Sequence, residues 1–188
     1  MKKLVILSTF MALLALPGMA PAETMEARLS GYNEIHFGGG PPATLRGAIS
    51  TNAAGRFRAK LHEGRDVIEY ELSYNDLRGQ VTQAHIHFGQ RHSVGGIVVW
   101  LCQTSTNPAP AAVAGLTPDC PLQGTVTGMI TPAQVLAQAA QGFDGAFGDF
   151  DALVRAIHGR AAYVNVHSSL FGAGEIRGQI RASRRNRD

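Results

Sequence analysis

The 188-residue sequence has one tryptophan, two cysteines and only 16% charged residues. It also lacks a serine or cysteine nucleophile signature, a glycine-rich loop that would cradle phosphates, and a paired-carboxylate motif. A hydrolase or isomerase that uses His167 as a general base finds little support, because no oriented acid accompanies this residue. The sequence therefore favours a protein without enzymatic activity.

Long hydrophobic runs are also scarce, and the one near the start spans residues 4–16. Lys2 and Lys3 precede this run, and the small residues Ala20 and Ala22 follow it, which is typical of a cleaved export signal over residues 1–22. A membrane anchor is the alternative, but the run is shorter than the ~20 residues that span a bilayer. We therefore expect an exported protein, periplasmic or extracellular, with no membrane span after cleavage.

The sequence has no strong excess of charge of either sign. Its net charge of +3 falls to +1 once the two lysines of residues 1–22 are removed. The arginine-rich tail, residues 182–188 with the adjoining Arg181, carries a net charge of +3, which leaves −2 for the body of the protein. The body therefore offers no basic groove, and we expect no nucleic-acid partner. Residues 23–181 have the length and composition of a single domain.

The only two cysteines are Cys102 and Cys120, which enclose a loop of 17 residues. In an oxidising compartment they are free to pair, and closing a loop of this length stabilises a protein by about 3 kcal/mol. Two unpaired buried thiols are the alternative. A redox-active pair is disfavoured, because the two cysteines are not close together in the sequence.

Short alternating runs separated by glycine, asparagine and proline predict an antiparallel β sandwich or barrel. Asn52 to Gly55 read as a hairpin turn, and two helices are predicted before the last two strands, at residues 132–141 and from about Asp149 to His158. The predicted strands are residues 27–32, 44–51, 56–62, 67–74, 81–88, 97–101, 124–130, 161–167 and 175–181.

Histidines recur on one face of the predicted strands. In the segment QAHIHFG, alternation places His85 and His87 on the face opposite the apolar Ala84, Ile86 and Phe88. The same argument, applied to AAYVNVHSS and GEIRGQI, places six more polar or aromatic residues on an outward face, namely Tyr163, Asn165, His167, Glu175, Arg177 and Gln179. If these strands are close in the sheet, three histidines share one polar face.

Three imidazoles on a rigid sheet can hold one metal ion. Ligation by His85, His87 and His167 suits copper first and zinc second, with Asn165, Glu175 and Arg177 orienting the ligands. In the alternative interpretation, His85 and His87 are structural and bond to Glu175 or to backbone groups, while Glu175 and Arg177 form a lateral ion pair. Spare ligand candidates are His36 and His92.

Three segments together resemble the CHRD domain, a family named after chordin: RLSGYNE, LRGQVTQAHIHFG and AAYVNVHSSLFGAGEIRGQI. The resemblance covers residues 29–180. It implies an immunoglobulin-like antiparallel architecture and a binding role without a settled activity. One departure is the segment IHFGGGPP after Glu34, where such domains typically continue with a proline pair; a small insertion containing His36 would explain it.

The layout of HIHFG and VNVH is also similar to the copper ligands of copper/zinc superoxide dismutases. This likeness implies His85, His87 and His167 as copper ligands, in an all-β Greek-key sandwich. The zinc subsite does not match, since His92 is the only histidine between His87 and His158.

Two hypotheses follow from these residues and resemblances. The first is an exported binding or structural module, with an unidentified protein or matrix polymer as its partner. The second is a copper-binding protein for metal handling or weak redox chemistry.

Overall fold

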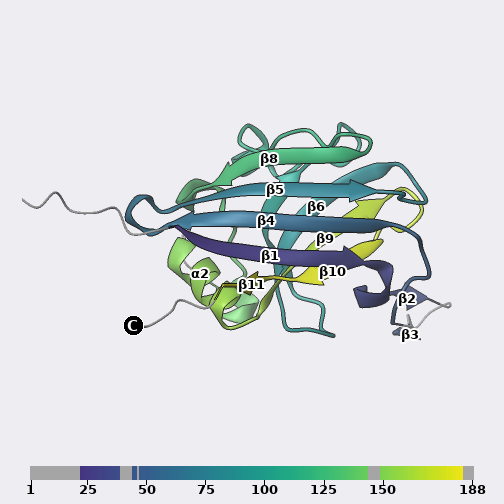
Figure 1. Ribbon diagram of the computed structural model, residues 1–188, viewed down its shortest axis with the longest axis horizontal. Helices are drawn as coiled ribbons and strands as arrows, with labels where there is room; N and C mark the ends of the chain where they lie inside the picture. The colour runs from purple at the N-terminus through teal and green to yellow at the C-terminus, as the bar shows by residue number, and fades with distance from the viewer. Residues whose placement is uncertain (1–21, 39–43, 46, 144–148, 184–188) are drawn as a thin grey trace, which may run out of the picture.

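A computed structural model describes residues 22–38, 44–45, 47–143 and 149–183 (Figure 1). Almost all of the predicted export signal, and the tail from residue 184, lie outside this part of the chain. No helix in the described part has the length and apolar character needed to span a bilayer. The strands are β1 (Glu23–Ser30), β2 (Phe37–Gly38), β3 (Thr44–Leu45), β4 (Ala54–His62), β5 (Val67–Asn75), β6 (Val81–Phe88), β7 (Gly96–Cys102), β8 (Gly124–Ile130), β9 (Ala162–Ser168), β10 (Ile176–Gln179) and β11 (Arg181–Ala182).

One antiparallel sheet forms the body of the protein, in the order β7-β6-β9-β10-β1-β4-β5-β8, with β11 pairing with β1. The strands β2 and β3 form a separate small pair. The outermost strands β7 and β8 contact each other, so the sheet is nearly closed. Figure 1 shows β1, β4, β5 and β8 as a layer in front of β6 and β9. The predicted all-β antiparallel class is confirmed.

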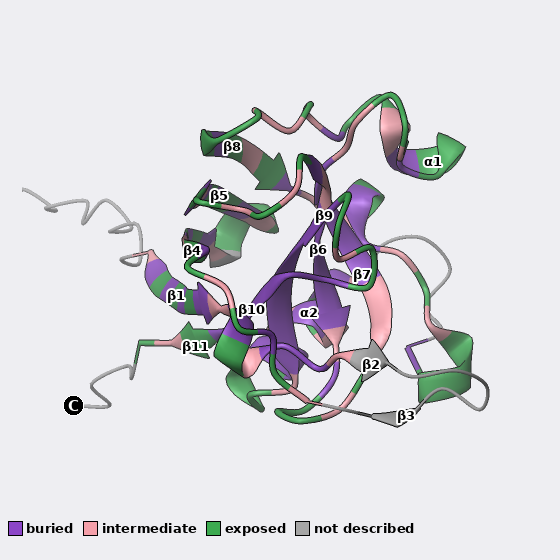
Figure 2. Cartoon of the chain, turned by 90° about the vertical axis from the view of Figure 1, so that its right-hand side faces the viewer, coloured by how far each residue is buried: buried purple, intermediate pink, exposed green. Residues whose placement is uncertain are grey.

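The strands of the front layer alternate between buried and exposed side chains. Their buried side chains point toward the layer of β6 and β9, so the core lies between the two layers. In β4 and β5 every second side chain is buried, including Phe57, Leu61, Ile68 and Leu72. Full burial of side chains of this size stabilises a fold by roughly 1.5–3 kcal/mol each. Figure 2 shows the contrast: β1, β4 and β5 alternate between buried and exposed, whereas β6, β9 and β10 contain buried and intermediate residues but no exposed one.

Helices are few and short. The helix α2 (Phe150–His158) begins after Asp149, whose side chain accepts a hydrogen bond from the Ala152 amide, and it precedes β9 as predicted. The other elements are α1 (Ala111–Ala114), which was not predicted, and the single-turn 3-10 helices η1 (Gly31–Asn33), η2 (Glu63–Arg65), η3 (Pro132–Gln134) and η4 (Ala139–Gln141).

The predicted helix over residues 132–141 is wrong, although its start is right. Thr131 and Gln134 form a capping box at this start, but η3 ends after one turn. The chain then becomes extended, and the Leu136 amide donates to the Val98 carbonyl of β7. Pairing with the sheet therefore outweighs the local helix signal.

The predicted strand over residues 44–51 is also wrong beyond β3. Gly47 and Ala48 both have positive φ angles, of 65° and 48°, which a regular strand does not contain. The amides of Ala48 and Ile49 donate to the carbonyls of Glu34 and Gly31, so this segment is tied to the η1 turn. Consequently no hairpin forms at 52–55, and β4 already begins at Ala54.

The disulfide between Cys102 and Cys120 is present, as predicted. It joins the end of β7 to the approach to β8 and encloses the loop that carries α1. Ala109 and Val113 of this loop pack against Trp100 of β7 in a second, smaller apolar cluster. The disulfide loop thus covers the outward face of β7.

Candidate metal centre

Strand pairing brings the polar residues of β6, β9 and β10 into neighbouring rows. His85 of β6 pairs with Asn165 of β9, and Asn165 pairs in turn with Arg177 of β10. On the other side of β6, His85 pairs with Trp100 of β7. The predicted proximity of these strands is therefore correct, because β6, β9 and β10 are consecutive in the sheet.

The face that carries these residues was expected to be open to solvent, and this expectation is wrong. It faces away from the main core, but His85, His87 and His167 are 0%, 8% and 6% exposed. Alternation cannot distinguish a solvated face from a second buried one, because in both cases side chains of one type recur every two residues. The cover comes from loops that are distant in sequence.

Three loops supply much of this cover, and each one bonds to a residue of the face. The loop after β6 bonds through Gly95 to His87 and Tyr163. The loop after β9 bonds through Gly172 to His167. The segment after η1 contributes Glu34, which accepts from Asn165.

The three histidine rings converge. A nitrogen of each of His85, His87 and His167 lies within 4.8 Å of the corresponding nitrogen of the other two. Of these nitrogens, His85 Nδ1 and His167 Nε2 lie 3.2 Å apart. In addition, His85 packs edge-on against Trp100, and His87 stacks on Tyr163 with ring centroids 4.7 Å apart. These aromatic contacts fix the orientations of the rings.

The hydrogen bonds at the back of two rings decide which nitrogens carry protons. The Nδ1 atoms of His87 and His167 each lie 2.9 Å from a carbonyl oxygen, of Gly95 and Gly172 respectively. A carbonyl only accepts, so Nδ1 must donate in both rings. In the neutral rings Nε2 then carries a lone pair and faces the centre of the cluster. Among the nitrogens of the three rings, only His85 Nε2 is buried without a partner in the described residues.

Burial keeps the three rings neutral. It lowers the pKa of His87 to about 4, outweighing the hydrogen bond to Gly95 that favours the charged form. Burial also lowers the pKa of His167, and it lowers that of His85 well below its usual value, with further lowering from the charges of the other two rings. Neutral imidazole is the form that binds metal ions, so no proton has to leave the cluster near pH 7. For His85 Nδ1, which faces His167 Nε2, to bind an ion, the single proton of the His85 ring must lie on Nε2.

Asn165 adds an oxygen to the same space. Its Oδ1 lies 2.8 Å from His167 Nε2 and 3.1 Å from His87 Nε2, while its Nδ2 donates to Glu34 at 3.3 Å. In this orientation three hydrogen-bond acceptors lie together, Asn165 Oδ1 and the Nε2 atoms of His87 and His167. A bound cation would remove the repulsion between them. Gly174 makes the arrangement possible: its φ is 121°, and a Cβ there would overlap Asn165 and Glu34.

The opposite amide orientation of Asn165 would need a proton on Glu34. Rotated by 180°, Nδ2 would donate to the two imidazoles and Oδ1 would face the Glu34 carboxylate, which must then be protonated to form a hydrogen bond. Burial raises the pKa of Glu34, against weaker opposing effects of the Ile35 amide, Asn165 and Arg177. The cluster therefore has two self-consistent states, one with a cation and one with a protonated Glu34.

Two further residues predicted to orient ligands lie on the same face but contact other groups. Glu175 is fully buried and accepts hydrogen bonds from Thr51, Ser168 and the Arg78 amide. The Arg177 guanidinium lies 3.3 Å from the centre of the Tyr163 ring. In the described residues, no ion pair joins Glu175 to Arg177 and no hydrogen bond joins Glu175 to His85 or His87.

Sequence reasoning missed Glu34 and Trp100 as neighbours of the cluster. Glu34 follows a single-turn helix and has no periodic pattern around it, so its position depends on the η1 turn and on the hydrogen bond from the distant Ala48 amide. Trp100 lies in a continuous apolar run, GIVVWLC, in which both faces of the strand are buried. The spare candidates His36 and His92 do not belong to the cluster that the described residues form.

The donor set fits a mononuclear transition-metal site. Nitrogens bound to one ion at about 2.0–2.1 Å stand about 3.3 Å apart in a tetrahedral site and cannot exceed about 4.2 Å. The separation of 3.2 Å between His85 and His167 already meets this condition. A pair at the outer limit of 4.8 Å has to close by roughly 0.6–1.5 Å on binding. Imidazole nitrogens favour copper and zinc over calcium and magnesium.

These features define a class of protein, an antiparallel β domain with a buried three-histidine cluster behind its main core. Comparison with protein families identifies the CHRD domain over residues 25–180, which is most of the chain. The chain belongs to the CHRD domain family. No curated protein and no solved structure matches it significantly. The similarity of its histidine layout to copper/zinc superoxide dismutases stays a prediction.

Proposed function

We propose that this protein is an exported binding module that holds one metal ion, copper in preference to zinc, with His85, His87 and His167. The observation that carries the proposal is the convergence of nitrogens from three neutral rings, of which His87 and His167 are held from behind by loop carbonyls and His85 is held by Trp100. A site prepared in this way avoids much of the cost of ordering ligands when the ion binds.

Copper is the first choice because of the donor types. Imidazole nitrogen suits both copper and zinc, and at a given site of nitrogen and oxygen ligands copper(II) binds more tightly than zinc(II). Asn165 Oδ1 provides a fourth donor or holds the rings in place. When bound, copper supplies one-electron redox chemistry, and the surrounding residues supply a dry pocket and fixed ligands.

Titration with copper(II), followed by electron paramagnetic resonance, tests the proposal. The sample is the processed protein prepared without a histidine tag and first treated with a chelator. We expect one ion per chain, with nitrogen hyperfine structure from imidazole ligands. In His85→Gln, His87→Gln and His167→Gln, binding should weaken at least tenfold, as removing an inner ligand or its support typically does.

His92→Gln is the matched control, because His92 is an exposed histidine outside the cluster. It should bind copper as the wild type does. Circular dichroism of each variant checks that the fold is retained. Equal binding by the wild type and the three cluster variants, or no stoichiometric binding at all, would contradict a metal site.

The alternative role for the cluster is structural. The rings contact Asn165, two loop carbonyls and each other, so the network by itself fixes β6 against β9. In that case the protein serves as a binding or structural module of the CHRD type, with a protein or matrix polymer as its partner and no metal. The copper titration separates the two roles.

A further inference from the structure

A cleft of about 310 Å³ opens on the outward face of β1 and β10. Ser30 of β1 pairs with Arg177, and Glu26 pairs with Arg181, so Arg28 lies between these two positions on the same strand. The loop after β6 adds one more cationic residue. Four arginines line the cleft in total: Arg28, Arg91, Arg177 and Arg181.

Most of these arginines have no anionic partner in the part of the chain that the structure describes. Within the described residues, Arg28, Arg91 and Arg181 form no ion pair and no side-chain hydrogen bond. The one acid that lines the cleft, Glu26, is paired with Arg56 at 2.9 Å. The cleft therefore has an excess of positive charge that the fold itself does not neutralise.

Arg177 is the strongest sign of a missing ligand. Arg177 is only 2% exposed, yet among the described residues its guanidinium donates one hydrogen bond, from Nη2 to the Gln90 carbonyl, and no carboxylate lies within 4 Å. The guanidinium rests on the Tyr163 ring, which leaves its remaining donors around the edge. The Glu34 carboxylate acts on this charge but forms no ion pair with it in the described residues. An anionic group in the cleft would therefore offset more of the cost of burying the guanidinium.

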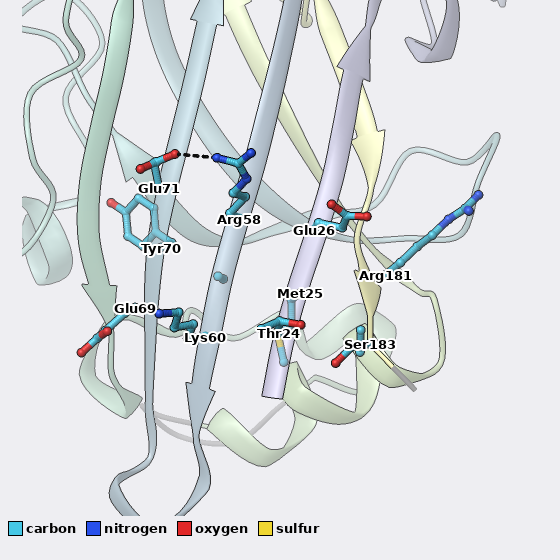
Figure 3. A pocket seen from close by; sticks show the side chains of 12 residues that line it. Thr24, Met25, Glu26, Arg58, Lys60, Glu69, Tyr70, Glu71, Arg181 and Ser183 are labelled. Carbon is cyan, nitrogen blue, oxygen red and sulfur yellow. Dashed lines mark hydrogen bonds and ion pairs between the residues drawn. The ribbon is translucent and has the colours of Figure 1, made fainter. Parts of the chain in front are cut away.

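A second hollow shows what a charge-balanced surface looks like in this protein. About 690 Å³ in volume, it lies over β1, β4 and β5, where Arg58 pairs with Glu71 and acids and bases alternate (Figure 3). Arg181 borders both hollows, but Figure 3 shows its side chain extending away from the other labelled residues. The excess of arginine is therefore specific to the smaller cleft.

We propose that this cleft binds a small molecule through a phosphate or carboxylate group. The guanidinium fork matches the planar or tetrahedral oxygens of both groups, and several forks around one cleft favour an anion with two or more charges. The volume is at the lower end of the range for small-molecule sites. Gln179 and Asn33, which also line the cleft, offer further hydrogen bonds. This inference does not depend on the metal proposal.

Calorimetric titration of the chelator-treated protein with inorganic phosphate, and separately with succinate, tests the cleft and distinguishes the two oxyanion types. The buffer contains neither group and little salt, because salt screens exposed charges. We expect saturable binding at one site per chain, with acetate binding more weakly than either probe. The double variant Arg28→Gln/Arg91→Gln should lower the affinity about five- to tenfold.

Arg65→Gln is the control, because Arg65 is an exposed arginine in η2 that does not line the cleft. It should leave binding unchanged. Arg177→Lys keeps the charge but loses the fork, and we expect it to lower the affinity about tenfold or more while circular dichroism stays the same. No saturable binding up to roughly 10 mM of either probe, ten times a Kd of about 1 mM, would overturn the proposal. Equal weakening by Arg65→Gln would do so too.

Discussion

Acidification should destabilise the metal-free protein well above the pH at which carboxylates titrate. In the unfolded chain His87 takes up a proton near pH 6.5, whereas in the folded protein its pKa is about 4. Between these values the unfolded state binds more protons, so the free energy of unfolding falls as the pH falls. The stability that the neutral ring provides is complete above pH 6.5 and is lost toward pH 4.

The magnitude follows from the two pKa values of His87. Their difference corresponds to about 3 kcal/mol in full, of which about 2 kcal/mol appears between pH 7 and pH 5. The lowered pKa values of His85 and His167 act in the same direction. Glu34 acts in the opposite direction: its pKa is raised, so the stability it provides is present below about pH 4.5 and is lost at higher pH.

Urea denaturation at pH 7, 6 and 5, in the presence of a chelator, measures this effect. Trp100 is the only tryptophan, and its ring centroid lies 4.3 Å from that of His85, so its fluorescence reports on the cluster itself. His87→Gln should remove about 2 kcal/mol of the pH dependence, and the exposed His92→Gln should leave it unchanged. A free energy of unfolding that does not change between pH 7 and pH 5 would refute the reasoning.

Three other predictions concern stability at pH 7, measured by urea denaturation. Replacing both Cys102 and Cys120 by serine should cost about 3 kcal/mol and, by freeing the loop over Trp100, also shift its emission. Glu175→Gln should cost about 1.5–3 kcal/mol, because a fully buried carboxylate accepts three hydrogen bonds; no change would mean that these bonds are replaced by water. Gly178→Ala should cost about 1–3 kcal/mol, since the added Cβ would overlap the Arg28 carbonyl, and a neutral effect would show that β1 and β10 can separate freely.

Local patterns predicted the strands and the facing of the histidines well. The limits of β6 and β8 agree with the prediction, and alternation correctly placed Ala84 and Ile86 in the core opposite His85 and His87. These features depend on neighbours along the chain, and the side-chain period of a strand is fixed at two residues. The prediction failed where distant contacts decide, as at residues 47–51, which bond to the η1 turn rather than to a strand.

The sequence by itself determined an all-β domain, two cysteines able to pair, and three histidines on one face. Only the tertiary structure decided that this face is buried, that Glu34 and Trp100 lie beside the rings, and that four arginines from separate segments border one cleft. The physical reason is the range of the interactions: strand alternation is written in consecutive residues. Loop cover and the meeting of charges arise between segments that the chain brings together only on folding.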